Sequence, residues 1–106
     1  MNEIIPIDEN NRRLFFRIIA ALESEEEAAA FFDELCTRQE VKTITQRAAA
    51  AELLVQGFTY DEIKQMLKRG DSTISSATVN RVSDTVKNGG GALCRIIQRT
   101  SGAEGC

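Results

Sequence analysis

Apolar residues recur at helical spacing along most of the chain, and no segment of any length shows the alternation that is typical of a β-strand. The clearest series lies between residues 41 and 55. Its apolar positions follow steps of three and four residues: Val41, Ile44, Ala48, Ala51 and Val55. This spacing indicates a helix that packs along one face against other helices. We therefore predict an all-α fold.

The first predicted helix has a different pattern, because residues 14–22 are apolar on almost every side, with Arg17 as the exception. A helix of this kind has to be buried on several sides. A chain of 106 residues offers little other protein to cover it. A second copy of the chain would supply the cover, so we expect a homodimer.

Three Ser or Thr residues stand three positions before a Glu, which is the sequence of a capping box. The pairs are Ser24 with Glu27, Thr37 with Glu40, and Thr59 with Glu62. Each pair predicts the start of a helix. We also expect an earlier helix from Asp8 to about Leu22. The longest helix should end near Gln56, with Gly57 in the left-handed conformation behind it.

The order of these signals predicts one helical domain over residues 8–99, as is usual for a chain of this length. An N-terminal tail, 1–7, precedes it, and a flexible C-terminal tail, 100–106, follows it. Within the domain we expect dimerisation helices over 8–57, a helix-turn-helix over 59–87 and a short last helix over 92–99.

The composition excludes several classes of function. Apolar residues are 42% of the chain and charged residues 27%, as in a soluble globular protein. No apolar run reaches the roughly 18 residues of a membrane span, and the N-terminus lacks the basic start of a signal peptide. We therefore expect a cytoplasmic protein without a membrane partner. Without His, catalysis of the Ser-His or Cys-His type is excluded, and Cys36, Cys94 and Cys106 make a poor metal site. We expect no catalytic residue, metal or cofactor.

The charge is unevenly distributed along the chain. Residues 1–36 carry nine acids and three bases, whereas residues 37–106 carry seven acids and ten bases. A basic part in an otherwise acidic chain is compatible with one face that meets an anionic partner.

The third capping box is followed by the pattern of a helix-turn-helix. Thr59 opens a short helix, a turn follows, and a second helix begins near Ser76 with Val79, Val82 and Val86 on one face. Small residues at its start let the backbone approach DNA, and its free N–H groups favour a phosphate. We predict that this helix binds double-stranded DNA. The alternative is an ordinary amphipathic helix with a polar outer face.

The candidate DNA-binding residues lie on the polar face of the second helix and around the first. On the second helix they are Ser76, Ala77, Thr78, Asn80 and Arg81, and around the first they are Lys64, Lys68 and Arg69. Asn80 can bond an adenine edge, and Arg81 can bond a guanine edge or a phosphate. The three basic side chains around the first helix would meet the phosphate backbone.

In their order along the chain these features resemble the Trp-repressor-like family, and especially its YerC/YecD-type branch. The resemblance rests on the segments ALESEEE (21–27), FFDELCT (31–37), QR (46–47), GFTYDEI (57–63) and SATVNRV (76–82). It implies an intertwined homodimer of about six helices per chain with a helix-turn-helix on each side. It also implies a sequence-specific transcriptional regulator that acts as a repressor.

The resemblance implies a candidate effector pocket as well. A Thr and two Arg hold tryptophan in the Trp repressor itself, and Thr37, Arg47 and Arg81 occupy the matching positions here. The residue after the second Arg is Gly there and Val82 here, and the Val side chain projects into the space that an indole would need. We therefore predict that tryptophan is not the corepressor. The two Arg can instead pair with nearby acids, and the sequence indicates no other effector.

The turn between the two helices, residues 68–75, is longer than the family's turn by about five residues. We expect Gly70 to end the first helix, Ser75 or Ser76 to cap the second, and the inserted segment, with Ile74 as its only apolar member, to form a mobile surface loop. A rival hypothesis is a helical dimer that acts through protein contacts and keeps the helix-turn-helix as a scaffold. The acidic N-terminal third and the long turn favour this rival.

Overall fold

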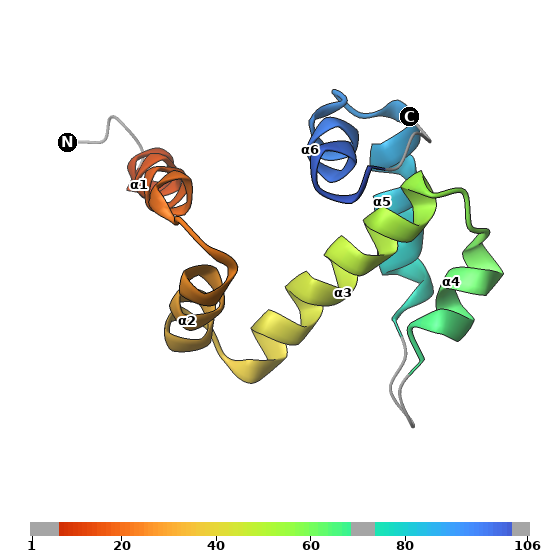
Figure 1. Cartoon of the computed structure of the whole chain (residues 1–106), viewed down its shortest axis with the longest axis horizontal. Coiled ribbons are helices and arrows are strands. Elements are labelled where there is room, and N and C mark those ends of the chain that lie inside the picture. The colour runs from red at the N-terminus through yellow and green to blue at the C-terminus, as the bar shows by residue number, and fades with distance from the viewer. Residues whose placement is uncertain (1–6, 69–73, 103–106) are drawn as a thin grey trace. The chain divides into compact units, whose positions relative to one another are not determined.

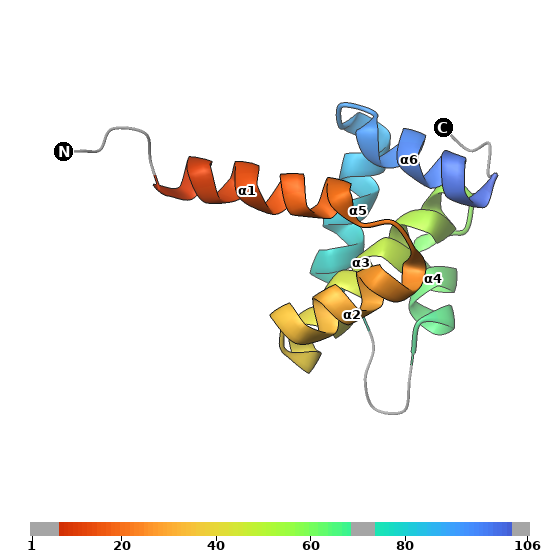
Figure 2. The same cartoon turned by 60° about the vertical axis from the view of Figure 1, so that its left-hand side comes forward.

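A computed structural model describes residues 7–68 and 74–102, and all regular secondary structure in these ranges is helical (Figures 1 and 2). The helices are α1 (Ile7–Ala21), α2 (Glu25–Leu35), α3 (Arg38–Val55), α4 (Tyr60–Met66), α5 (Ser76–Asn88) and α6 (Ala92–Ser101). The predicted all-α fold is confirmed. The chain divides into two compact units, Met1–Val41 and Lys42–Cys106.

The first unit holds α1 and α2, which touch through aromatic rings. Phe15 of α1 and Phe32 of α2 make an edge-to-face contact with their ring centroids 6.4 Å apart. Among the described residues of this unit none is buried, and Leu14 and Phe16 are each 50% exposed. One copy of the chain therefore leaves much of the apolar surface of α1 in contact with water.

Side-chain caps at the three predicted sites fix where α2, α3 and α4 begin. The Thr37 and Thr59 hydroxyls accept a hydrogen bond from the Glu N–H three residues on, at 3.1 and 3.2 Å, and each Glu carboxylate accepts from the Thr N–H at 2.8 Å. The Ser24 hydroxyl likewise accepts from the Glu27 N–H at 3.0 Å, but the Glu27 carboxylate accepts from the N–H of Glu23. All three predicted helix starts are confirmed. At the first, the carboxylate bonds the N–H of the residue before the cap and not that of the cap itself.

The corner between α3 and α4 is a Schellman turn. The Gly57 N–H donates to the Leu54 carbonyl at 3.1 Å, and the Phe58 N–H donates to the Leu53 carbonyl at 3.0 Å. Gly57 has φ of +100°, which confirms its predicted left-handed conformation. Because Thr59 then caps α4 at once, the direction in which α4 leaves α3 is set by hydrogen bonds on both sides of the corner.

The second unit is built around a small core to which α3, α4 and α5 all contribute. Its fully buried members are Ala50, Ile63, Ile74 and Val79, none of them more than 1% exposed. Partly buried side chains pack against these: Leu53, Leu54, Phe58, Tyr60 and Leu67. The shared core holds α4 and α5 in a fixed relation to each other, and α6 packs on α5.

The structure differs from the prediction at three helix boundaries, one start and two ends. The first helix begins at Ile7, so Asp8 lies in its first turn and does not cap it. The helix expected to end at Gly70 ends at Met66, because the Lys68 N–H turns back to the Gln65 carbonyl and closes the helix. Gly70 itself lies outside the described residues. The last helix, α6, continues past the predicted end at residue 99 to Ser101, into the segment predicted as a tail.

The expectation that the inserted turn is a mobile surface loop is wrong at Ile74. This side chain is 1% exposed and belongs to the core, because it offers apolar surface directly before the start of α5. Residues 69–73 of the turn lie outside the described residues. Ser75 caps α5 as predicted, since its hydroxyl accepts from the Thr78 N–H at 3.1 Å.

Candidate nucleic-acid interface

Helix α5 turns one face into the core and the other outward. Val79 is fully buried and Val82 is 7% exposed. Ala77, Asn80 and Arg81 of the opposite face are exposed. A helix that enters the major groove needs this arrangement, in which its apolar face holds it to the domain and its polar face is free.

Two predicted DNA-binding residues at the start of α5 already have partners within the chain. The Thr78 hydroxyl lies 2.8 Å from the Ser75 hydroxyl, and Thr78 is half-buried. The exposed Ser76 accepts a hydrogen bond from the ammonium of Lys64 at 3.0 Å. Thr78 is therefore less accessible to DNA than Ser76 and Ala77, since its hydroxyl bonds the cap residue Ser75.

Lys64 connects α4 with the start of α5. Besides its bond to Ser76, its ammonium lies 5.7 Å from the centroid of the Tyr60 ring. Lys68 follows α4 and is exposed, whereas Arg69 lies outside the described residues. Of the three basic residues predicted around the first helix, the structure thus brings Lys64 to the beginning of the candidate recognition helix. Tyr60 was not among the site residues predicted from the sequence, although its spacing of four residues from Lys64 on a helix was the available signal.

The three candidate effector residues come from both units, Thr37 from the first and Arg47 and Arg81 from the second. The Thr37 hydroxyl accepts from the Glu40 N–H, so this Thr has a structural role as the cap of α3. Both Arg are exposed. Val82, next to Arg81, is 7% exposed.

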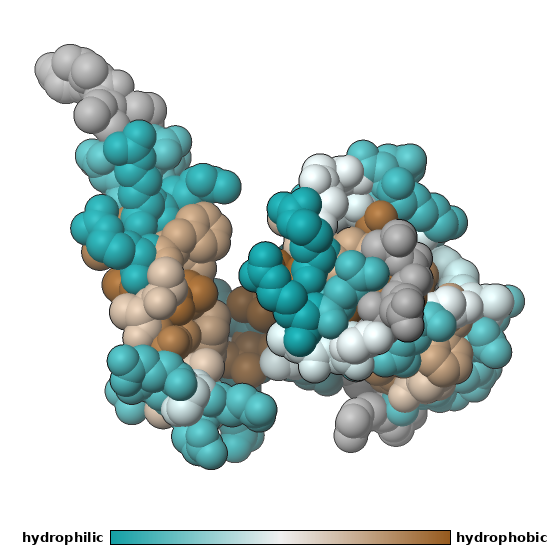
Figure 3. All heavy atoms as spheres, turned by 45° about the horizontal axis from the view of Figure 1, so that its top comes forward, coloured by the Kyte–Doolittle hydropathy of each residue, from teal (hydrophilic) through white to brown (hydrophobic). Residues whose placement is uncertain are grey.

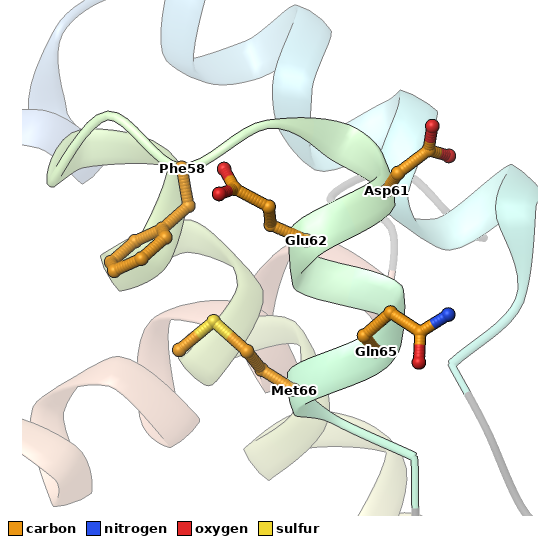
Figure 4. Close-up of a pocket in the computed structure, with 5 residues that line it drawn as sticks. All are labelled: Phe58, Asp61, Glu62, Gln65 and Met66. Atoms are coloured by element: carbon orange, nitrogen blue, oxygen red, sulfur yellow. The ribbon is translucent and has the colours of Figure 1, made fainter.

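An open hollow of about 320 Å³ lies along α4 (Figure 4). Its lining residues are Phe58, Asp61, Glu62, Gln65 and Met66. Phe58, Glu62 and Met66 point to one side of α4, whereas Asp61 and Gln65 point to the other. This surface was not predicted from the sequence, although the spacing of four residues between Phe58, Glu62 and Met66 could have indicated it. Met66 is 50% exposed, so the hollow is an open apolar surface and not an enclosed ligand cavity.

The capping box of α4 also keeps a negative charge at the start of that helix. The Thr59 N–H donates to the Glu62 carboxylate at 2.8 Å, and this bond, together with the Thr59 hydroxyl, holds the pKa of Glu62 below its ordinary value. A carboxylate in the first turn complements the helix dipole.

Within the described ranges, no group of three or more Cys, Asp or Glu residues could hold a metal ion. No helix there is long and apolar enough to cross a membrane.

Comparison with known families agrees with this arrangement. The model of the Trp repressor protein family matches residues 10–101, which include both helices of the helix-turn-helix. The chain belongs to the Trp repressor family. The resemblance seen in the sequence is thereby confirmed, and the family is one of DNA-binding regulators.

Two relatives place the chain more closely within the Trp repressor family. The uncharacterised protein YerC of Bacillus subtilis is 33% identical over 74 residues, which are 70% of this chain and 66% of that protein, just under two thirds of its length. The crystal structure of a candidate Trp repressor from Staphylococcus aureus matches with a TM-score of 0.77 and 32% identity. That match covers 97% of this chain and all of the other, so the fold is shared over nearly the whole chain.

Proposed function

We propose that the chain is a homodimeric, sequence-specific DNA-binding regulator, a repressor of transcription in the cytoplasm, that does not use tryptophan as its corepressor. The observation that carries the proposal is the presentation of α5. The N-terminus of α5 is capped by a hydrogen bond within the chain, and its apolar face is buried in the domain. Ala77, Asn80 and Arg81 are exposed. Membership of the Trp repressor family supports DNA as the partner.

Direct readout of bases follows from the chemistry of two exposed side chains. The Asn80 amide matches the paired donor and acceptor of adenine in the major groove, and the Arg81 guanidinium matches the two acceptors of guanine. Ala77 near the start of the helix leaves room for the backbone to approach. Lys64 and Lys68 would meet phosphates, which positions the helix without selecting a sequence.

The dimer is proposed from the apolar surface that one chain leaves exposed. Leu35 of α2 is 57% exposed and Ile44 of α3 is 45% exposed, in addition to Leu14 and Phe16 of α1. Figure 3 shows apolar side chains at the surface of the part that carries the N-terminus. Apolar side chains gain about 25 cal/mol for each Å² removed from water, so a second copy that covers them would stabilise both chains. Obligate interfaces of this kind bury on the order of 2,000 Å² or more.

The test of DNA readout begins with genomic footprinting of the tagged protein, which identifies the preferred site. Asn80→Ala and Arg81→Ala should then each weaken binding to that site by about 1–3 kcal/mol and leave the dimer folded. Asn88→Ala and Arg99→Ala are the matched controls, because both residues are exposed and lie away from the start of α5. Unchanged affinity of both α5 variants would show that this helix does not read bases.

The test of the dimer is sedimentation of the unmodified chain over a range of concentrations. A compact, folded monomer at micromolar concentration would contradict the proposed obligate dimer. The rival function, a helical dimer that acts through protein contacts, is favoured by the acidic N-terminal third, because residues 1–36 carry nine acids and three bases. Salt dependence separates the two functions. Phosphate neutralisation makes DNA affinity fall steeply with salt, whereas a protein-contact module shows no such DNA binding.

A further inference from the structure

The geometry at the junction of α4 and α5 points to a role for Tyr60. We propose that Tyr60 is a positioning residue for DNA binding, whose ring, together with the Ser76 hydroxyl, holds the Lys64 ammonium in place to neutralise one backbone phosphate at the start of α5. This inference rests on the proposed function and deepens it. It names the two residues that hold Lys64 in place for its phosphate contact.

Lys64 is held from two directions. Its ammonium lies 3.0 Å from the Ser76 hydroxyl of α5 and 5.7 Å from the centroid of the Tyr60 ring on α4. A distance below about 6 Å is that of a cation–π contact. A free lysine side chain loses much rotamer entropy when it is fixed on a ligand. Here part of that entropy is already lost in the folded chain, so the cost of fixing Lys64 on a phosphate is smaller.

The Tyr60 ring and the Ser76 hydroxyl, which hold Lys64, are themselves fixed. Tyr60 is half-buried and packs against the core of the second unit. Ser76 is the first residue of α5, directly after the cap Ser75. The Ile63 side chain, next to Lys64 on α4, is fully buried and fixes the backbone from which the lysine extends. The position of the ammonium is therefore determined by the packing of α4 against α5.

The Lys64 ammonium, although held in place, can still bind a phosphate. An ammonium group has three N–H donors, and the bond to Ser76 uses one of them. A cation–π contact is electrostatic and leaves N–H donors for an anion. Because Ser76 begins α5, a phosphate bound by Lys64 would lie beside the first turn of the helix that carries Asn80 and Arg81. The contact would thereby set where this helix sits along the groove.

Lys68 supplies a matched comparison. It is also a lysine close to the end of α4, it is exposed, and it lies beyond the last helical turn. A phosphate contact by Lys68 would not depend on the Tyr60 ring. We therefore expect phosphate binding by Lys64 to depend on Tyr60 and phosphate binding by Lys68 not to depend on it.

The experiment measures binding of the full chain to a fluorescent DNA duplex of mixed sequence, by anisotropy over a series of KCl concentrations. The variants are Lys64→Gln, Lys68→Gln, Tyr60→Phe and Tyr60→Leu, with Tyr60→Leu also placed in each lysine background. Ser76→Ala, alone and with Lys64→Gln, repeats the comparison at an exposed residue, so the proposal stays testable if Tyr60→Leu does not fold. Circular dichroism establishes which variants are folded.

We expect Lys64→Gln to make the slope of log affinity against log salt shallower by about 1.8 for the dimer, because each of its two chains loses one phosphate contact worth about 0.9 on duplex DNA. Tyr60→Leu should weaken binding about two- to fivefold, and Tyr60→Phe, which keeps the ring, should bind like the unmodified chain. The effect of Tyr60→Leu should disappear in the Lys64→Gln background and persist in the Lys68→Gln background, because only coupled residues deviate from additivity. Ser76→Ala should show the same dependence on Lys64.

An equal weakening by Tyr60→Leu in the unmodified and the Lys64→Gln backgrounds would overturn the inference, because Tyr60 would then act only through the fold. A slope unchanged by Lys64→Gln would overturn it too. Both results differ from a failure of the proposed function, in which the unmodified chain itself would bind the duplex weakly and without a steep salt dependence.

Discussion

Truncation of Ile74 tests whether the long turn is anchored in the core. We predict that Ile74→Ala lowers the free energy of unfolding by about 3–4 kcal/mol, in the upper part of the range for buried Ile to Ala. Ile74 is 1% exposed and packs in one cluster with Ala50, Ile63 and Val79. Ala50 has a short side chain that cannot extend into the cavity, so the site would collapse poorly.

A loss of this size is large beside the 5–15 kcal/mol that typically separates a folded domain from its unfolded chain. It should also reach the DNA-binding helix, because Ile74 directly precedes Ser75, the cap of α5. We therefore expect weaker DNA binding even under conditions in which the variant is still mostly folded. A mobile surface loop would give neither effect, because truncation of an exposed side chain removes no buried contact and usually changes the free energy of unfolding by less than about 0.5 kcal/mol.

The assay is equilibrium urea unfolding, followed by circular dichroism at one fixed protein concentration, since the stability of a dimer depends on concentration. Ile74→Val should cost only about 0.5–1.5 kcal/mol, because it removes a single methylene group. Met66→Ala is the matched control, an apolar side chain of α4 that is 50% exposed. A loss below about 1 kcal/mol for Ile74→Ala, equal to that of the Met66 control, would refute the burial of Ile74.

Three further predictions concern single residues. Calorimetry should show no binding of L-tryptophan at physiological concentrations, since the Val82 side chain takes the space of the indole; a micromolar dissociation constant would contradict this. The lowered pKa of Glu62 adds stability that is present above its ordinary value of 4.5 and is lost as the pH falls through the lowered pKa of the folded state. Unfolding midpoints measured between neutral and acid pH should therefore fall less for Glu62→Gln than for the unmodified chain, and parallel curves would exclude the effect. Gly57→Ala should cost about 1–2 kcal/mol through the left-handed backbone alone, because nothing lies within 4 Å of an added Cβ; an unchanged thermal midpoint would be inconsistent with the Schellman turn.

The local signals of the sequence were sufficient for most of the helix starts and for the corner before α4. Ser24, Thr37 and Thr59 cap the helices that they predict, and Gly57 adopts the left-handed conformation expected of it. These features are determined by hydrogen bonds between residues at most about five positions apart, so the sequence around each one contains the information. The polar and apolar faces of α5 followed from spacing for the same reason.

Helix ends were harder to predict from the sequence. Gly70 looked like the end of the first helix of the helix-turn-helix, but α4 ends at Met66. Gly and Ser residues show where a chain can turn, and they do not show which of several permitted turns the packing will use. Asp8 failed as a cap for a similar reason, since acids are as favourable within the first turn of a helix as before it.

The candidate site was predictable as a set of residue types and not as a set of contacts. The sequence alone determined that Asn80 and Arg81 lie on the polar face of a helix, because this depends on a period of 3.6 residues. Only the tertiary structure decided that Ile74 enters the core and that Lys64 reaches Ser76, twelve positions away. Both depend on how α4 packs against α5, a relation between segments on opposite sides of the long turn. No local pattern encodes that relation, because it arises when several apolar faces are buried together.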